Sequence, residues 1–254
     1  MHVSPLLQIG VIGFLAQIID GALGMGYGVT SAVFLISLGI SPLIASASIH
    51  TSEIFTTFVS GASHFKFGNV RKDLLWPLIS FGILGGILGA CGLVKFPLKP
   101  IKLVVGLILL SMGSIIFYSF MFRYKNVNTS EIKKYSVNKL RTLGFFAAFI
   151  DALGGGGWGP ICTPTLVITG TEPNKAVGSV DLAEFFITIA ITSTLLILIG
   201  SEGFRWDVVF ALLIGGVIGA PLAAFICKKL PKSFLGMLVG ITVIILSLRM
   251  ILRR

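Results

Sequence analysis

Two glutamates deep inside apolar segments are the residues of this sequence with the clearest capacity for chemistry. Glu53 lies in the segment 42–65 and Glu184 in the segment 175–199. A charged side chain at the centre of a membrane helix costs roughly 2.5–3.5 kcal/mol on insertion scales, and such acids commonly mark proton or substrate pathways. An apolar setting favours the protonated form of a carboxyl group. We therefore predict that both glutamates take up and release protons; the alternative is a hydrogen-bond clasp on nearby helix ends.

Each glutamate follows another ionisable side chain by three residues. His50 precedes Glu53, and Asp181 precedes Glu184. A spacing of three places both members of a pair on one face of a helix. We predict that His50 and Asp181 tune the proton affinity of the glutamates. For His50, a core histidine with satisfied hydrogen bonds is the alternative.

Two glycine-rich runs, 21–28 and 154–159, interrupt apolar segments of helical length. Each glycine costs roughly 1 kcal/mol relative to alanine inside a helix, so the runs predict helix breaks. Pro160 suits the first residue of a new helix, because it lacks the N–H group that would be unpaired there. Asp20 and Asp151 stand just before the breaks, where we expect them to cap or close the broken ends.

The half-helices that follow the breaks would point free N–H groups and a positive dipole end inward, which suits an anion. Nearby hydroxyl groups could donate further hydrogen bonds, although serines in apolar helices often bond to their own backbone. Close helix crossing is the alternative explanation for the glycines. The predicted anion-binding residues are Gly26, Gly28, Ser48, Thr51, Gly156, Gly157, Gly159 and Ser179.

These features occur twice. Residues 20–53 match residues 151–184 without a gap, at a constant offset of 131 residues. The match pairs Asp20 with Asp151, for example, and the later segments repeat with small shifts. Duplicated, interrupted apolar segments are typical of secondary transporters whose binding site lies where the two repeats meet.

The composition predicts an all-α integral membrane protein. Of the 254 residues, 55% are hydrophobic and only 12% are charged, which is too apolar for a soluble domain. The segments have the length of helices and lack the alternation of barrel strands. The net charge of +10 comes from lysines and arginines between the apolar segments, so we assign it to cytoplasmic loops and expect no nucleic-acid partner.

About eight membrane segments are expected, in two homologous repeats of four, with segments one and five broken. Residues 1–122 form the first repeat, 123–141 a basic connecting loop, and 142–254 the second repeat. If segments one and five are re-entrant hairpins, the two repeats have inverted orientations in the membrane. If these segments span the membrane, the two repeats have the same orientation. In both arrangements one side holds 13 of the 20 Lys and Arg residues, and loops 66–72 and 123–141 lie there, in the cytoplasm. We favour inverted repeats, because broken helices usually accompany them.

Two Gly-x-x-x-Gly spacings, Gly82–Gly86 and Gly215–Gly219, permit close approach of helices. Packing within the chain and a homodimer interface both use this pattern. The three cysteines lie in apolar segments without metal-ligand spacing, so we expect neither a metal nor a cofactor.

In the order and duplication of these elements, the sequence resembles the TauE/SafE sulfite exporter family, also called the toluene sulfonate uptake permease family. The resemblance covers nearly the whole chain. The residues that carry it are Gly24–Gly28, Gly154–Gly159, Pro160, Pro164, Gly39, Pro42, Ala45–Ser48, Gly170, Pro173, Ala176–Ser179, Ser60–His64 and Gly68–Val70. It implies an inner-membrane carrier of small sulfur-containing anions, coupled to an ion and independent of ATP.

The sequence therefore predicts a proton-coupled secondary transporter that exports a small sulfur-containing anion, such as sulfite or an organosulfonate. An importer, a carrier of another small anion and a passive anion channel remain alternatives. A membrane-embedded hydrolase using Asp20 and Asp151 is disfavoured, because both precede the glycine runs and no Gly-x-Gly-Asp motif occurs. We expect no enzyme activity.

Overall fold

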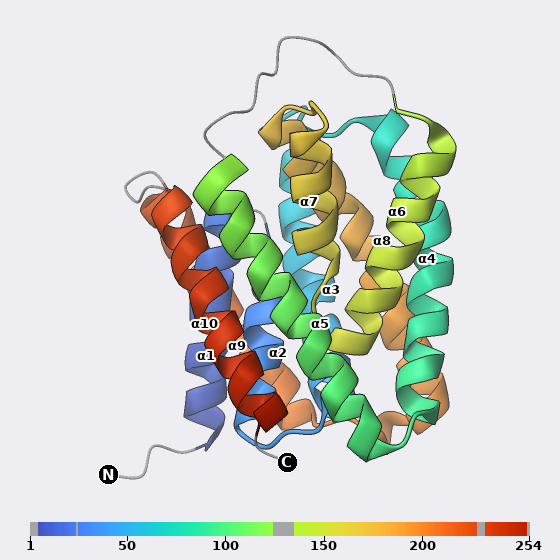
Figure 1. The fold of residues 1–254 in the computed structure, drawn as a ribbon, viewed down its shortest axis with the longest axis vertical. Coiled ribbons are helices and arrows are strands. Elements are labelled where there is room, and N and C mark those ends of the chain that lie inside the picture. Colours follow the sequence, from blue (N-terminus) through green and yellow to red (C-terminus); the bar gives the residue numbers. More distant parts are fainter. Residues whose placement is uncertain (1–4, 24, 124–134, 228–231, 253–254) are drawn as a thin grey trace.

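The computed structural model describes residues 5–23, 25–123, 135–227 and 232–252, and these residues are almost entirely helical (Figure 1). The α-helices are α1 (Pro5–Leu23), α2 (Tyr27–Ser37), α3 (Pro42–Lys66), α4 (Lys72–Lys95), α5 (Leu98–Tyr118), α6 (Val137–Gly154), α7 (Trp158–Ile168), α8 (Pro173–Ile199), α9 (Trp206–Cys227) and α10 (Lys232–Leu252). A π-helix, η1 (Ser119–Arg123), extends α5, and a short 3-10 helix, η2 (Ser201–Gly203), precedes α9.

Length and composition make three of the helical stretches suitable for crossing a membrane: Lys72–Lys95, Leu103–Phe122 and Pro173–Ile199. Shorter apolar helices accompany them within α1, α2, α9 and α10. Large apolar side chains such as Phe55, Phe58 and Trp76 are exposed on the outside of the bundle. Apolar surface of this extent is typical of a protein that faces lipid.

The predicted breaks divide segments one and five into helical hairpins, α1–α2 and α6–α7. In the first hairpin, α1 begins and α2 ends at the same end of the molecule, where Pro5, Leu38 and Arg205 line one cleft. In the second, α6 begins and α7 ends at the opposite end, where the Tyr135 hydroxyl donates a hydrogen bond to the Leu166 carbonyl. Figure 1 shows the two hairpins entering the bundle from opposite ends.

We name the two ends of the bundle by their turns. The α2–α3 end holds residues 38–41, and the α3–α4 end holds residues 67–71. The start of α8 lies at the α3–α4 end, since the Lys175 ammonium donates to the Gly68 carbonyl. Helix α8 therefore runs from the α3–α4 end toward the α2–α3 end.

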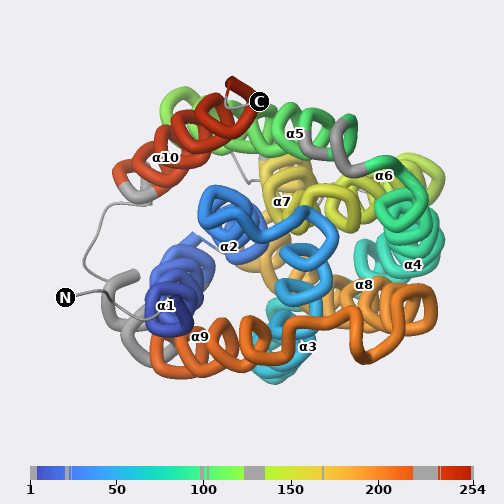
Figure 2. The backbone as a smooth tube through the Cα atoms, turned by 90° about the horizontal axis from the view of Figure 1, so that it is seen from below, coloured from blue at the N-terminus to red at the C-terminus, as the bar shows by residue number. Residues whose placement is uncertain are grey.

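Helices of one half of the chain pack against helices of the other half. Helix α1 lies along α9, α6 lies along α4, and the α3–α8 and α5–α10 pairs also join the halves (Figure 2). Small residues bring the backbones together: a Cβ atom on Gly215 would lie 2.0 Å from the Gly10 carbonyl oxygen, and one on Gly85 2.1 Å from the Phe145 carbonyl oxygen. The Gly-x-x-x-Gly glycines likewise contact α1 or α8, so these spacings serve packing within the chain.

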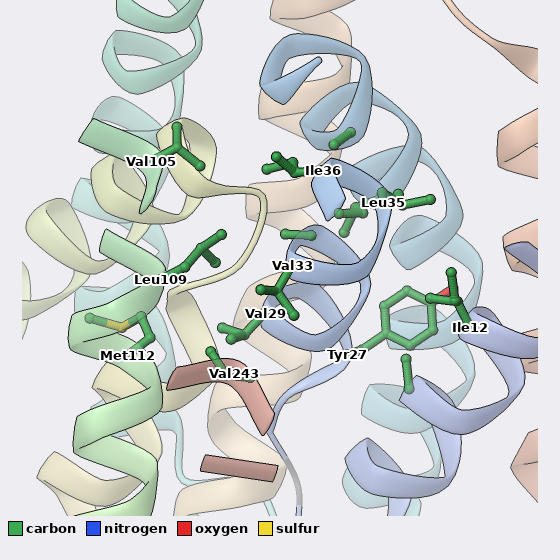
Figure 3. Close-up of a cluster of buried hydrophobic side chains, with 14 of the residues drawn as sticks. Ile12, Tyr27, Val29, Val33, Leu35, Ile36, Val105, Leu109, Met112 and Val243 are labelled. Atoms are coloured by element: carbon green, nitrogen blue, oxygen red, sulfur yellow. The ribbon is translucent and has the colours of Figure 1, made fainter. Parts of the chain in front are cut away.

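Two clusters of buried apolar side chains fill the bundle, one around α2 and the other around α8. Figure 3 shows part of the first cluster, in which Val29 and Val33 of α2 lie beside Leu109 and Met112 of α5. The half-length helix α2 is thus enclosed by the other helices, as is α7, whose Trp158 is fully buried. Because the half-helices are enclosed, the interrupted backbone has protein contacts. A break that faced lipid would lack such contacts.

Several boundaries differ from the predicted ones. Helix α6 begins at Val137, inside the expected 123–141 loop, because the apolar pattern of segment five extends into the loop's basic C-terminal part. The half-helices begin at Tyr27 and Trp158, so Pro160 is the third residue of α7 and not its first. Proline is tolerated there, since the N–H groups of the first helical turn have no intrahelical partner. Residues 124–134 of the expected loop lie outside the described residues.

Candidate functional site at the helix breaks

The first break is closed by the aspartate that precedes it. Asp20 lies in the last turn of α1, and its Oδ1 accepts a hydrogen bond of 3.3 Å from the Tyr27 backbone N–H. Gly26, which precedes α2, has φ of 120°, a conformation that favours glycine. Asp20 thus occupies the N-terminal end of α2, where an anion was predicted to bind.

The second break has the same construction with more contacts. Asp151 lies in the last turn of α6, and its Oδ1 accepts hydrogen bonds from the backbone N–H groups of Gly157 (2.7 Å) and Trp158 (3.2 Å). Gly155 has φ of 73° and ends α6 in the left-handed conformation. A carboxylate of the protein therefore lies on the N-terminal amides of α7, where the helix dipole favours negative charge.

His50 contacts Asp151 across the two halves. Its Nε2 lies 3.1 Å from Asp151 Oδ2, while Nδ1 lies 2.8 Å from the Ser46 carbonyl oxygen. His50 and Asp151 together form a buried pair between the two halves, whereas the helical spacing predicted a partnership of His50 with Glu53.

The two glutamates lie at one cavity between the breaks. Glu53 and Glu184 line it together with Asp20 and Asp151, and its free volume of about 10 Å³ accommodates roughly one water molecule. The predicted glycines at the breaks and Pro160 line the same cavity: Gly26, Gly28, Gly156, Gly157, Gly159 and Pro160. The cavity thus brings four acids and the two breaks into one site.

The two breaks also touch each other. A Cβ atom on Gly28 would lie 2.8 Å from Gly156 Cα and 3.1 Å from Glu53 Oε1, and one on Gly156 would lie 2.1 Å from the Val29 nitrogen. These glycines therefore provide a close backbone crossing, the alternative role considered from the sequence, as well as lining the cavity.

The predicted hydroxyl residues do not line the cavity. Thr51 donates to the Ala47 carbonyl, and Ser179 donates to the Lys175 carbonyl, as serine and threonine often do in apolar helices. Ser48 is buried, and its hydroxyl has no hydrogen-bond partner among the described residues.

Two threonines that sequence reasoning missed, Thr56 and Thr57, do line the cavity. Both follow Glu53 by about one helical turn, and Thr57 Oγ1 donates to the Glu53 carbonyl. Their spacing from Glu53 was a signal that could have identified them, since residues three and four apart share a helix face.

Asp181 lies outside the cavity, nearer the α3–α4 end than Glu184 on the same helix. Its Oδ2 accepts a hydrogen bond of 2.6 Å from the Ser60 hydroxyl, so its partner again belongs to the other half of the chain. Within the described part of the chain, no group of three or more His, Cys, Asp or Glu side chains is arranged to hold a metal ion.

Comparison with known proteins identifies the family of this chain. The profile of a family described as "Sulfite exporter TauE/SafE" matches residues 9–250. The chain belongs to this family. It is also 43% identical over 249 residues to "Probable membrane transporter protein YtnM" of Bacillus subtilis (strain 168), an alignment covering 97% of this chain and 82% of that protein. No solved structure matched.

The TauE/SafE chain is therefore an integral membrane transporter, located in the bacterial cytoplasmic (inner) membrane. Among the described residues, three of its apolar helices have the length that this location requires.

Proposed function

We propose that this TauE/SafE protein is a proton-coupled carrier that exports a small sulfur-containing anion, such as sulfite or an organosulfonate. The observation that supports this most directly is the Asp151 carboxylate on the Gly157 and Trp158 amides. An oxyanion and a carboxylate both present oxygen acceptors to such amides. A substrate oxyanion could therefore bind at α7 by displacing the carboxylate of Asp151, and at α2 by displacing that of Asp20.

Displacement gives a physical reason for coupling to protons. A displaced carboxylate and a bound anion would lie side by side in a buried space, which is electrostatically unfavourable. Protonation of the carboxyl group removes that repulsion. The described residues that line the cavity include four acids and neither Lys nor Arg, so protons are the simplest source of compensating positive charge.

The site must open for this exchange, because sulfite is larger than the single water molecule that the cavity accommodates. At the α2–α3 end, a cleft of about 750 Å³ lies at the mouth of the α1–α2 hairpin and is lined by Gln8, Ser41 and Arg205, among others. At the α3–α4 end, the Tyr135 hydroxyl contacts Leu166 and Thr171 and joins the two ends of the α6–α7 hairpin. We propose that the hairpins open alternately toward the two ends.

Uptake of radiolabelled sulfite into proteoliposomes, with and without an imposed pH gradient, tests this function. Competition by sulfate, thiosulfate, taurine and acetate would define the substrate class. We expect gradient-driven, saturable uptake that a sulfur-containing anion inhibits. Absence of flux for every sulfur anion would contradict the substrate proposal, and flux that ignores the gradient and does not saturate would indicate a passive channel.

Glu53→Gln and Glu184→Gln test the coupling. Glutamine keeps the size and the hydrogen-bonding capacity but removes the exchangeable proton, so uptake should lose its response to the pH gradient in each variant. Transport by both variants with the full pH dependence of the wild type would contradict proton coupling through the glutamates. The exposed Ser63→Ala, on the same helix as Glu53, is the matched control.

A further inference from the structure

Polar side chains lie between the acid-lined cavity and the α3–α4 end, where helices α3 and α8 cross, and they form a candidate polar path. The crossing is close, because a Cβ atom on Gly61 would lie 2.9 Å from Leu182 Cα. It brings Asp181 of α8 against Ser60 and His64, which are neighbours one turn apart on α3. Asp181 Oδ2 accepts from the Ser60 hydroxyl at 2.6 Å and lies 3.8 Å from His64 Nε2.

His64 forms the outer end of this path. Its side chain is 27% exposed, compared with 9% for Asp181, so it lies between solvent and the buried carboxylate. The Asn69 amide nitrogen lies 3.2 Å from His64 Nδ1. An amide nitrogen can only donate, so Nδ1 accepts this bond and the neutral ring carries its hydrogen on Nε2, facing Asp181. The tautomer thus directs a proton toward the interior.

Asp181 forms the inner end. Its charge acts on those of Asp20 and Glu184, both of which line the cavity, so protonation of one acid changes the electrostatic energy of the others. The other charged group of α8 near this end is Lys175, which donates to the Gly68 carbonyl. Histidine at the outer end and acids at the inner end are the residue types that form intramembrane proton relays.

We infer that His64 and Asp181, with Ser60 holding the Asp181 carboxylate in place, carry protons between solvent at the α3–α4 end and the acid-lined cavity. The ring takes up a proton at Nδ1, in exchange for the Asn69 bond, and releases its Nε2 proton to Asp181. The ring then returns to the first tautomer by exchange with water, gaining a proton at Nε2 and losing the one at Nδ1. The 3.8 Å contact must shorten by about half an ångström for transfer, a change within the range of side-chain motion.

This relay rests on the proposed proton-coupled transport and adds the route by which the proton arrives. Two assays on the same proteoliposomes separate the route from the transport itself: sulfite uptake driven by a pH gradient, and exchange of radiolabelled sulfite for unlabelled sulfite at equal pH. Exchange needs no net release of protons, so it reports whether the protein is folded and binds its substrate.

His64→Gln should slow gradient-driven uptake about tenfold or more, because a proton-transferring side chain contributes at least that much. Exchange should stay within about twofold of the wild type. His64→Ala should give the same results as His64→Gln in both assays. Added imidazole should restore gradient-driven uptake in His64→Ala by replacing the missing ring. Ser63→Ala, one residue away and exposed, should leave both assays unchanged.

Normal gradient-driven uptake in His64→Gln would overturn the relay and leave the proposed function intact. An equal loss of gradient-driven uptake and of exchange, without rescue by imidazole, would assign His64 a structural role. This result would also overturn the relay. Failure of the wild type to respond to the gradient would instead contradict the proposed function itself.

Discussion

The aspartates at the two breaks hold equivalent positions but differ in their contacts. Among the described residues, Asp20 accepts a backbone hydrogen bond from Tyr27, whereas Asp151 accepts two, from Gly157 and Trp158, and contacts His50 as well. In the other half, the position equivalent to His50 is occupied by Asp181, an acid. In the part of the chain that the structure describes, the α6–α7 break therefore has a basic partner that the α1–α2 break lacks. We expect release of the aspartate to cost a different free energy at each break.

Asp151→Asn should be more disruptive than Asp20→Asn. Breaking a buried charge pair by removing one partner typically costs about 3–5 kcal/mol, while loss of one charged hydrogen bond costs about 1.5–3 kcal/mol. The Asp151 variant should therefore show the larger fall in melting temperature in detergent, with Asp20→Asn as its matched control. Equal melting temperatures would contradict the unequal roles assigned to the two aspartates.

At the scale of the elements, the crossing of the two hairpins depends on glycine. A Cβ atom on Gly156 would meet the backbone of α2 at 2.1 Å, and backbone atoms can move away only if a whole hairpin moves. The hairpins are therefore in close steric contact at Gly28 and Gly156, and we expect displacement of one to displace the other.

Gly156→Ala should abolish transport and lower the melting temperature, because the methyl group forces the hairpins apart. Gly92→Ala, in α4, is a suitable control: its Cβ would meet only side-chain atoms at 3.7 Å and beyond, an ordinary contact. That variant should keep transport and gain up to about 1 kcal/mol of stability from the higher helix propensity of alanine. Transport at the wild-type rate by Gly156→Ala would show that the crossing is looser than described.

At the scale of the whole molecule, the hairpins set the direction of every later helix. Because α1–α2 returns to its own end, the turn at 38–41 and the turn before α9 lie together, opposite the turn at 67–71. Lys66, Arg71, Lys72 and Lys175 gather at the α3–α4 end, which the positive-inside rule assigns to the cytoplasm.

Cysteine labelling in intact cells tests this topology in a cysteine-free background. Glu202→Cys should react with a membrane-impermeant thiol reagent, whereas Phe67→Cys should react only after the cells are opened. If segments one and five spanned the membrane instead, both turns would face the same side. Identical accessibility of the two positions would therefore contradict the hairpin arrangement.

The sequence predicted the helices and the breaks well, because both depend on local composition. Long apolar runs require helices, and repeated glycines remove helix preference wherever they occur. The acids at 53 and 184 and the aspartates before the breaks were also identifiable as a common site, since their spacing recurs in both halves.

Contacts between the halves could not be derived in this way. His50 and Asp151 are separated by 101 residues, and Ser60 and Asp181 by 121, so their contacts depend on how α3 and α8 cross the opposite half. Helical spacing paired His50 with Glu53 and Asp181 with Glu184, because it considers one helix at a time. The misplaced hydroxyls, Ser48 and Ser179, have the same explanation: a serine's neighbours depend on which helix faces it.

The crosswise packing of α1 on α9 and of α6 on α4 also restricts how a chain of this kind can arise. A polypeptide with only the first half would leave α1 and α4 without the partners that cover their glycine faces. It could satisfy them only by pairing with a second copy inserted into the membrane in the opposite direction. A single-half ancestor would therefore have had to tolerate both orientations, and fusion of two copies would have freed each to evolve a fixed one.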